Sequence, residues 1–483
     1  MHMAVVGAGY VGMVQAICLC DLGHSVVLIE NDADRHRMLD VQNLSPVNEP
    51  GVNEGLRRYR DSLLTVSSKL GDVGGCSIVF LCVGTPARRD GLLDVSQLET
   101  AVQQIADLLA QGTSQRNLTL VVKSTVPVGT CRRLRDRVLA AGVDSSRFAV
   151  IDNPEFLREG SGIADFKNPD RIVIGVDPET HHSPQALIDL YSSNSDHFQV
   201  AVMSWESAEL VKLASNAFLA SKISFANMIA DLCEQVGADA TDVLNAVGAD
   251  KRIGAQFLRP GIGWGGGCLP KDLDTLIHEL RLNDVPTGLL DGVRTVNRER
   301  PSKFVQTVKT ILGTLKDKRI AVWGLSYKGG TGDLRESPAL SVVNALLSAG
   351  ADVCAYDDPM PLMANVPNLE LASDGIDALR GAAALCILND NPQFAELLWS
   401  PACKEIMRST LVFDGRNLYN PHEIARFGYT YVGVGSRNGL PSAAAHKVLR
   451  QSIGRGEGGG GRVRDVVGGD GCELVEWRAG GEV

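Results

Sequence analysis

Residues 265–272, with the sequence GGGCLPKD, bring three glycines, a cysteine, a lysine and an aspartate into one short segment. The glycines allow the backbone to approach a ligand closely, and Pro270 is placed to begin a helix. Cys268 would then lie beside a helix N-terminus with Lys271 nearby, and both features lower the pKa of a thiol. The segment predicts a nucleophilic cysteine, although a buried cysteine in a tight turn is the alternative when it is read alone.

A glycine pattern at the N-terminus indicates a dinucleotide site. A short apolar strand at residues 3–6 runs into Gly7-Ala8-Gly9-Tyr10-Val11-Gly12, followed by an apolar-rich helix and a second strand at 25–29. The first glycine permits the tight turn, the second lets a pyrophosphate approach the backbone, and the third allows helix and strand to pack closely. The phosphates would lie at the helix N-terminus.

Glu30 ends the second strand, where a carboxylate can accept hydrogen bonds from both ribose hydroxyls. Because an acid at this position repels a 2′-phosphate, NAD is favoured over NADP. Arg35 is a candidate for covering the adenine ribose, and a solvated arginine at the start of a helix is the alternative. A hydride acceptor combined with a reactive thiol indicates oxidation of an alcohol past the aldehyde, since the thiol must first add to that aldehyde.

Three later segments have the pattern of strands that end in polar or turn residues. They cover residues 77–83, 118–123 and 148–152 and are followed by Gly84-Thr85-Pro86, Ser124-Thr125 and Asn153-Pro154-Glu155. In an open parallel sheet the carboxyl ends of the strands form the ligand-binding edge. Ordinary polar loops would explain any one of these segments, but less easily all three.

A long helical pattern runs from residue 204 to about 236 and is rich in apolar residues on most faces. Such a helix should be buried, and we expect it to pack against a second subunit. Glu209, Lys212 and Asn216 fall at helical spacing on one side. Because apolar residues surround Lys212, we expect it to turn into a pocket.

Residues 319–357 repeat the strand, turn, helix and strand of the N-terminus. Ser326 stands where the first copy has its second glycine, so close approach of a pyrophosphate is impaired, while Lys328, Arg335 and Arg416 supply cations. This pattern predicts a related nucleotide domain that binds a different phosphorylated ligand.

The composition sets the class of protein. A chain of 483 residues with 44% hydrophobic residues calls for two or three domains, and no apolar run reaches the roughly 18 residues that span a bilayer. Residues 1–6 run directly into a strand, so we expect no secretory leader and a cytoplasmic protein. The 11 scattered cysteines do not suggest a disulfide framework or zinc ligands, and the net charge of −10 disfavours nucleic-acid and membrane partners.

With these motifs in order, the sequence resembles the nucleotide-sugar 6-dehydrogenase family from residue 1 to about 435. The segments that carry the resemblance are Gly7 to Gly12, Glu49-Pro50-Gly51, Cys82 to Pro86, Lys123 to Pro127, Asn153 to Gly160, Lys212 with Asn216, the Cys268 segment, and Lys328 with Asp333 to Ser337. The resemblance implies an α/β protein with a Rossmann-type NAD domain (1–200), a central helical dimerisation domain (201–300) and a Rossmann-like UDP-binding domain (301–435). We expect the glycine-rich tail, 436–483, to be disordered.

The resemblance also implies a four-electron oxidation of UDP-glucose to UDP-glucuronate. One NAD oxidises the C6 hydroxyl to an aldehyde, Cys268 adds to it, and a second NAD leaves a thioester that water hydrolyses. Lys212, Asn216 and a water held by Asp272 and Thr125 match the family's positions for the first step, and Glu155 matches the base for hydrolysis. We expect no metal.

The resemblance carries over two sets of binding residues. The residues that match cofactor contacts are Gly7, Gly9, Tyr10, Val11, Gly12, Glu30, Arg35, Thr85, Thr125, Glu159 and Arg335. The residues that match substrate contacts are Glu155, Phe156, Leu157, Arg158, Glu159, Lys212, Asn216, Arg252, Phe257, Arg259, Gly261, Trp264, Gly265, Tyr327, Lys328 and Arg416. Among them, Arg252 matches an arginine that reaches the sugar site of a neighbouring subunit, so we expect at least a homodimer.

Some positions depart from the pattern of the UDP-glucose branch. Gly267 stands where serine is common, Trp264 where phenylalanine or tyrosine is usual, and Leu269-Pro270 is closer to the GDP-mannose branch. GDP-mannose and UDP-N-acetylhexosamines are therefore the alternative substrates. A two-electron hydroxyacid dehydrogenase would have no use for Cys268, and in a non-catalytic NAD-sensing assembly protein the catalytic set would be a coincidence.

Overall fold

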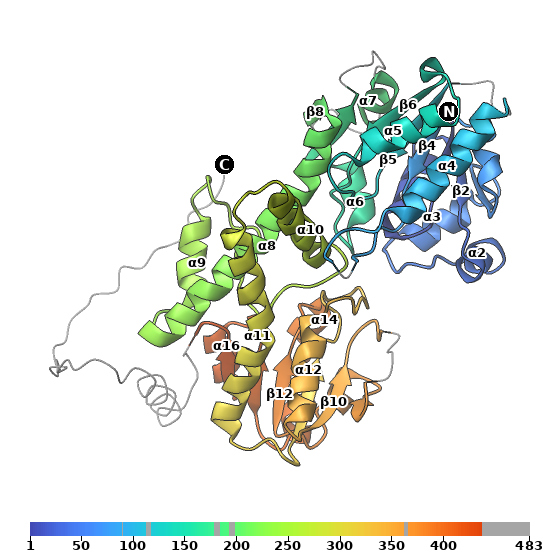
Figure 1. Ribbon diagram of the computed structural model, residues 1–483. Helices are drawn as coiled ribbons and strands as arrows, with labels where there is room; N and C mark the ends of the chain where they lie inside the picture. The colour runs from blue at the N-terminus through green and yellow to red at the C-terminus, as the bar shows by residue number, and fades with distance from the viewer. Residues whose placement is uncertain (89, 113–116, 178–183, 193–198, 362–365, 437–483) are drawn as a thin grey trace, which may run out of the picture. The chain divides into compact units, whose positions relative to one another are not determined.

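The computed structural model describes residues 1–436 except 89, 113–116, 178–183, 193–198 and 362–365 (Figure 1). The expectations for residues 437–483, including the disordered tail, lie outside the described residues. Within the described residues two sheets are present, with a long helix between them in the chain. None of the helices in these residues is long and apolar enough to cross a membrane.

The N-terminal sheet has the strand order β3-β2-β1-β4-β5-β6-β7-β8, and its pairs are parallel except β6 with β7. Its strands are β1 (His2–Val6), β2 (Ser25–Ile29), β3 (Leu64–Ser67), β4 (Ile78–Leu81), β5 (Leu118–Val122), β6 (Phe148–Asp152), β7 (Arg171–Val176) and β8 (Gln199–Ser204). The expected strands at 3–6, 25–29, 77–83, 118–123 and 148–152 correspond to β1, β2, β4, β5 and β6. Because β4, β5 and β6 are parallel neighbours, their carboxyl ends meet at one edge.

Helices cover both faces of this sheet, and the central strands are buried almost completely. These helices are α1 (Tyr10–Asp21), α2 (Ala33–Asp40), α3 (Val52–Tyr59), α4 (Ser96–Ala110), α5 (Thr130–Ala140), α6 (Gly162–Lys167) and α7 (Gln185–Ser192), with short 3₁₀ turns at Leu70–Gly75 and Ser145–Arg147. One core cluster joins α1 to β1, β2 and β4, and another joins α4 and α5 to the opposite face.

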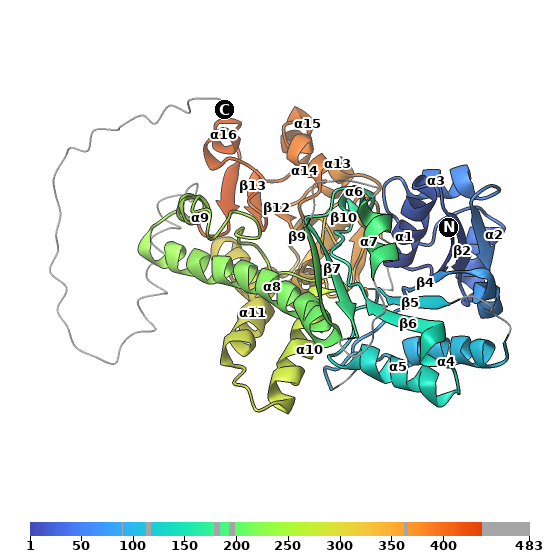
Figure 2. The same cartoon turned by 90° about the horizontal axis from the view of Figure 1, so that it is seen from above.

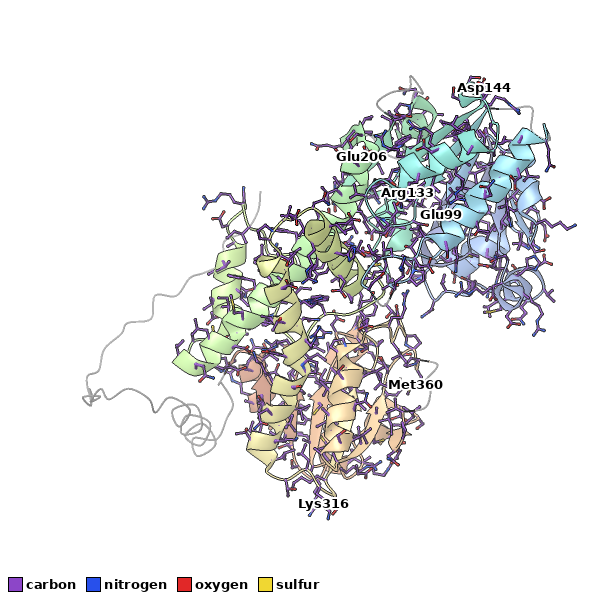
Figure 3. All side chains as sticks on the ribbon, viewed as in Figure 1. Glu99, Arg133, Asp144, Glu206, Lys316 and Met360 are labelled. Atoms are coloured by element: carbon purple, nitrogen blue, oxygen red, sulfur yellow. The ribbon has the colours of Figure 1, made fainter. Side chains whose placement is uncertain are left out.

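The long helix α8 (Trp205–Val236) follows β8. It leads to α9 (Ala240–Gly248), as Figure 2 shows. The Ser204 side chain caps its start by accepting a hydrogen bond from the Ser207 N–H, and Gly237 ends it in a left-handed conformation. Glu206, labelled in Figure 3, lies in the first turn and accepts hydrogen bonds from Arg132 of α5. The predicted helix is therefore present nearly from end to end.

One face of α8 packs against the helices that follow it, α10 (Leu269–Leu282) and α11 (Gly288–Leu312). Its opposite face carries an exposed apolar stripe, which consists of Phe218, Phe225, Met228, Leu232 and Val236. These five side chains recur at helical spacing along the C-terminal two thirds of the helix. Burial on most faces, as expected from the sequence, is therefore incomplete within a single described chain.

The C-terminal sheet has the parallel strand order β11-β10-β9-β12-β13-β14. Its strands are β9 (Arg319–Trp323), β10 (Asp352–Tyr356), β11 (Leu369–Leu371), β12 (Ala384–Ile387), β13 (Leu411–Asp414) and β14 (Thr430–Gly433). Its helices are α12 (Pro338–Ser348), α13 (Gly375–Ala378), α14 (Pro392–Leu397), α15 (Pro401–Ile406) and α16 (Pro421–Arg426). Helices α11 and α12 lie side by side on one face of this sheet and share its core (Figure 1).

Candidate active site

Each of the three glycines in the N-terminal turn has a different structural role. Gly7 has a φ of +97°, and a Cβ there would lie 2.8 Å from the Cys82 carbonyl oxygen. A Cβ on Gly12 would collide with the Gly7 carbonyl, whereas nothing lies within 4 Å of a Cβ built on Gly9. Gly9 precedes α1 and provides no side-chain cap, so the first N–H groups of this helix remain available to a phosphate. These features fit a bound NAD.

Glu30 is buried and held by two backbone N–H groups. Its Oε2 accepts from Ala8 N at 3.0 Å, and its Oε1 accepts from Asp32 N at 2.9 Å. Since each carboxylate oxygen has a second lone pair, Glu30 can still accept hydrogen bonds from ribose hydroxyls. Arg35 lies exposed on α2.

The second βαβ unit has the same turn as the first, but its acidic residue is already hydrogen-bonded within the chain. Gly324 N donates to the Tyr356 carbonyl at 2.8 Å, as Gly7 N donates to Ile29 in the first unit. The next acid, Asp357, accepts hydrogen bonds from the Ser326 N–H and hydroxyl and from Asn389. Because Ser326 and Asn389 already donate hydrogen bonds to the Asp357 carboxylate, the second unit lacks the ribose-binding acid that Glu30 provides in the first.

Glu155 and Lys212 form a buried ion pair, although they are far apart in the sequence. Lys212 Nζ donates to Glu155 Oε1 at 2.9 Å and to the Glu155 carbonyl at 2.7 Å. Leu157 N donates to the other carboxylate oxygen at 2.6 Å. Burial alone would raise the pKa of Glu155, but the charge and hydrogen bond of Lys212 outweigh burial and lower it. The pKa of Lys212 is raised because Glu155, Cys268 and Asp272 outweigh its burial.

A second buried pair joins α8 to α10. Asn216 Nδ2 donates to Asp272 Oδ2 at 2.6 Å, and Lys271 Nζ lies 2.5 Å from Asp272 Oδ1. Asp272 has no exposed surface. Thr125 is half-buried, and its carbonyl accepts from the Thr85 hydroxyl at 2.8 Å. Lys212, Asn216, Asp272 and Thr125, which were predicted to act in the first step, thus come from α8, from α10 and from the segment after β5.

Cys268 precedes the first turn of α10, and Pro270 lies in that turn, as predicted. Of the ten cysteines that the structure describes, it is the exposed one, and all ten are free thiols. The expectation of a lowered thiol pKa is wrong for this structure. Crowding by protein atoms, together with Glu155 and Asp272, raises the pKa of Cys268 to about 11. Lys212 and Lys271 oppose this shift only partly because each is already paired with a carboxylate.

Residues of the C-terminal part pack against the cysteine segment. Tyr327 and Arg335 both hydrogen-bond to the Glu159 carboxylate, each at 2.9 Å, and Lys328 Nζ donates to the Glu159 carbonyl at 2.5 Å. A Cβ on Gly266 would lie 2.7 Å from the Tyr327 ring, and one on Gly267 would collide with the Arg335 guanidinium. The glycine at 267, where serine is common in the UDP-glucose branch, therefore leaves room for Arg335 beside Cys268.

Comparison with known proteins identifies the family. The models of the UDP-glucose/GDP-mannose dehydrogenase family match in order: the NAD binding domain at residues 1–194, the central domain at 206–299 and the UDP binding domain at 321–421. The chain belongs to the UDP-glucose/GDP-mannose dehydrogenase family. This result confirms the resemblance found in the sequence, the α/β fold class and NAD as the cofactor.

Relatives and solved structures of this dehydrogenase family cover nearly the whole described chain. A UDP-glucose 6-dehydrogenase from Rhizobium meliloti is 38% identical over 448 residues, which is 90% of this chain and 99% of that protein. A UDP-glucose 6-dehydrogenase from Pseudomonas aeruginosa is 37% identical over 90% of this chain and 97% of that protein. The structure of a UDP-glucose dehydrogenase from Pyrobaculum islandicum has a TM-score of 0.81 at 34% identity, covering 90% of this chain and 98% of that one.

Five of the remaining predicted substrate residues are Phe257, Arg259, Gly261, Gly265 and Arg416. Arg416 is half-buried and donates to the carbonyls of Leu388, Gly263 and Tyr327, and Gly261 lies beside it. Gly265 is buried against Glu336, Phe257 has a positive φ of 65°, and Arg259 is exposed.

Six further residues of the predicted sets, four for the substrate and two for the cofactor, contact residues of their own chain. Trp264 packs in a core cluster and donates to the Ser224 hydroxyl at 3.0 Å, and Leu157 packs against the N-terminal core. Arg158 pairs with Asp165, while Tyr10 and Val11 lie half-buried in the first turn of α1, with the Tyr10 hydroxyl donating to the Arg158 carbonyl. Arg252 pairs with Asp250 of its own turn and is 89% exposed. In the part of the chain that the structure describes, Arg252 is therefore paired within its own turn rather than with Cys268.

Several residues that support the site were assigned no role in the sequence analysis. Glu209 lies on the same side of α8 as Lys212, but it accepts hydrogen bonds from Gly129 N and Cys131 N at the start of α5. Lys123 is buried and donates to Asn153 Oδ1 at 3.1 Å, and burial lowers the pKa of Lys123 to about 8. Arg171 lies against the Phe156 ring. For Lys123 and Arg171, a charged residue next to an apolar strand was the feature of the sequence that could have indicated a structural role.

Proposed function

We propose that the protein is a UDP-glucose 6-dehydrogenase, which oxidises the C6 hydroxyl of UDP-glucose to the carboxylate of UDP-glucuronate. The observation that carries this proposal is the exposed Cys268 beside two buried pairs, Glu155 with Lys212 and Asn216 with Asp272, in a chain of this family. The curated relatives named UDP-glucose 6-dehydrogenase support UDP-glucose as the substrate.

Bound NAD would accept one hydride from the C6 carbon in each of two successive oxidations. We propose that Gly7, Gly9 and Gly12 bind its pyrophosphate, with Glu30 at the ribose. The further cofactor contacts proposed for this site are Tyr10, Val11, Arg35, Thr85, Thr125, Glu159 and Arg335. The open space at Gly9 and the two backbone bonds that hold Glu30 support this placement.

The first oxidation requires the C6 hydroxyl to lose a proton. Lys212 Nζ uses two of its three N–H groups on Glu155, which leaves one to stabilise a developing alkoxide. Asn216, Asp272 and Thr125 are proposed to hold the water that receives the proton, and the hydrogen bond between Asn216 and Asp272 supports this proposal.

The thiol step explains why a cysteine is required. Cys268 Sγ forms a bond to the aldehyde carbon, and the thiol proton passes to the carbonyl oxygen, which becomes the thiohemiacetal hydroxyl. Loss of that hydroxyl proton and of the second hydride, which a second NAD would accept, leaves a thioester. Water then adds to the thioester carbonyl, the carbon–sulfur bond breaks, and the thiol is regenerated with the acid. The low pKa of Glu155 keeps it ionised at neutral pH, which is the form that can accept a proton from this water.

The UDP portion is proposed to bind between the cysteine segment and the C-terminal residues. Lys328, Arg416 and Arg259 supply cations for the diphosphate, and Gly261 and Gly265 allow the backbone to approach the ligand. The filled acid position at Asp357 supports a nucleotide sugar rather than a second dinucleotide at this domain.

We also propose a homodimer, in the cytoplasm, that pairs through α8. The exposed stripe of Phe218, Phe225, Met228, Leu232 and Val236 supports such an interface, because contiguous apolar surface on a helix is costly in water. Arg252 lies in the turn that follows α9 and is proposed to reach the sugar site of the partner subunit.

Stoichiometry tests this function. The protein is incubated with excess NAD and UDP-glucose, a UDP-N-acetylhexosamine or GDP-mannose, and NADH and products are quantified by absorbance and mass spectrometry. Two NADH for each UDP-glucuronate formed is the expected result. One NADH per substrate would indicate a two-electron dehydrogenase, faster turnover of another sugar nucleotide would change the substrate, and no turnover of any would favour a non-catalytic protein.

A further inference from the structure

The Phe156 ring lies beside two cations. The Arg171 guanidinium carbon is 4.0 Å from the ring centroid, and Lys212 Nζ is 5.4 Å from it. Arg171 begins β7, Phe156 belongs to the segment after β6, and Lys212 comes from α8. A guanidinium this close to a ring makes a favourable contact, and its planar shape restricts how the ring can turn.

The same guanidinium also contacts α8 directly. Arg171 Nη2 donates to the Ser215 hydroxyl at 3.2 Å. Ser215 immediately precedes Asn216, and Phe156 immediately follows Glu155. One arginine therefore touches the sequence neighbours of two residues proposed for the chemistry.

The backbone at residue 155 takes part in the site. Lys212 binds both the carbonyl and the carboxylate of Glu155, so a shift of the Phe156 ring would move an acceptor of Lys212. The segment is anchored before Glu155 by Asn153, whose amide donates to the Val173 carbonyl at 2.8 Å. After Phe156, the Arg158 N–H donates to Asp165 at 2.8 Å. Between these two anchors, the contact of the Phe156 ring with Arg171 holds the segment in place.

We propose that Arg171 is a positioning residue which, through the Phe156 ring and Ser215, holds Lys212, Glu155 and Asn216 in their reacting arrangement. This inference rests on the proposed function, because it assigns Arg171 to that reaction. Small displacements of reacting groups cost large factors in rate, so a residue without substrate contact can limit turnover.

The first test is Arg171→Gln, which keeps a polar side chain and removes the charge and the planar stack. We expect kcat to fall about three- to tenfold, the range given by a cation–π contact, while KM for UDP-glucose and NAD changes by less than about twofold. Lys212 and Lys123 are the cations that lower the pKa of Glu155. Loosening the pair with Lys212 should therefore move the acid limb of the kcat profile to higher pH, whereas loss of folded enzyme would only scale the profile down.

Matched variants separate this role from general destabilisation. Arg135→Gln removes another arginine, whose guanidinium carbon lies 5.6 Å from the Trp205 ring in the same part of the chain, and should leave kcat and its pH profile unchanged. Phe156→Leu should show the same pH shift as Arg171→Gln, and the double variant should lose less than the product of the two effects. Additive losses, or a folded Arg171→Gln enzyme with a normal profile, would overturn the proposal.

A crystal structure of Arg171→Gln gives a readout that does not depend on activity. We expect the Phe156 ring to turn and the contacts between Lys212 and Glu155 to lengthen, and an unchanged pair would overturn the proposal. If the wild-type protein oxidises no nucleotide sugar, the proposed function fails while this structural result still decides whether Arg171 positions the pair. Should Arg171→Gln not fold, Arg171→Lys and Phe156→Leu carry the same comparison.

Discussion

Cys268 is an exposed thiol beside charges that are already paired. Lys271 contacts Asp272 at 2.5 Å and Lys212 contacts Glu155 at 2.9 Å, so neither cation is free to stabilise a thiolate fully. The free protein should therefore hold Cys268 mainly as a thiol at neutral pH, with a pKa raised to about 11. Its reactivity then depends on what the bound cofactor and substrate change around it.

This charge arrangement predicts the pH dependence of alkylation of Cys268 in the free protein. Because only the thiolate reacts, the rate with iodoacetamide should rise about tenfold for each pH unit between 7 and 9, without a plateau. Peptide mass spectrometry at several times and pH values measures the rate at this residue, with Cys268→Ser as the unlabelled control. A plateau below pH 8 would show that the helix N-terminus and Lys271 determine the thiol pKa instead.

Glu155 is predicted to act in the last chemical step. In Glu155→Gln the side chain keeps its size but loses the charge that can accept a proton, so hydrolysis of the thioester should slow by about a hundredfold or more. Intact-protein mass spectrometry during turnover should then reveal a covalent adduct on Cys268. Normal turnover of Glu155→Gln without an adduct would show that Glu155 does not have this role. The control is the double variant Glu155→Gln, Cys268→Ser, which should form no adduct if Cys268 is the site of attachment.

At the scale of elements, α8 both builds the site and exposes an apolar stripe. Its buried side supplies Lys212 and Asn216, while Phe218 and Phe225 on the stripe are 67% and 44% exposed. A helix that packs on one face only within its own chain calls for a partner on the other.

The stripe predicts the effect of charge on assembly. Phe218→Asp combined with Phe225→Asp should convert a dimer to monomers, because two carboxylates in an apolar interface lose their hydration without a partner. Sedimentation velocity measures the change. Leu289→Asp is the matched control, since Leu289 of α11 is 79% exposed outside the stripe. If the wild-type protein is a dimer and the double variant stays one, the interface lies elsewhere.

At the scale of the whole molecule, the question is whether one chain makes a complete site. The Arg252 side chain is 89% exposed and pairs with Asp250 of its own turn. We therefore expect Arg252→Ala and Cys268→Ser to be nearly inactive separately, yet to regain part of the activity after mixing and reassociation. Mixed dimers would contain one site with an intact cysteine from one chain and an intact arginine from the other.

The mixing experiment needs proof of subunit exchange. Native mass spectrometry of tagged variants provides it, and equal mixtures should approach about a quarter of wild-type activity because half of the dimers are mixed and one of their two sites is intact. No recovery despite exchange would place Arg252 in its own subunit's site or outside the chemistry.

Local patterns in the sequence determined much of the molecule. The spacing of Gly7, Gly9 and Gly12 with Glu30 predicted the NAD domain, and helical spacing placed Lys212 and Asn216 on one side of a long helix. Pro270 correctly marked the start of the helix after Cys268. These features depend on residues within one or two turns or strands of each other, so composition and period are enough to reveal them.

Only the tertiary structure decided which charges meet. The pair of Lys212 with Glu155 and the pair of Asn216 with Asp272 join segments more than 50 residues apart. The thiol pKa followed from these pairs, because a cation that is already bound to a carboxylate does little for a neighbouring sulfur. Arg171 gained its place beside Phe156 only when β7 packed against α8. A pKa and a long-range contact depend on distance, burial and the partners of every charge, which spacing along the chain does not contain.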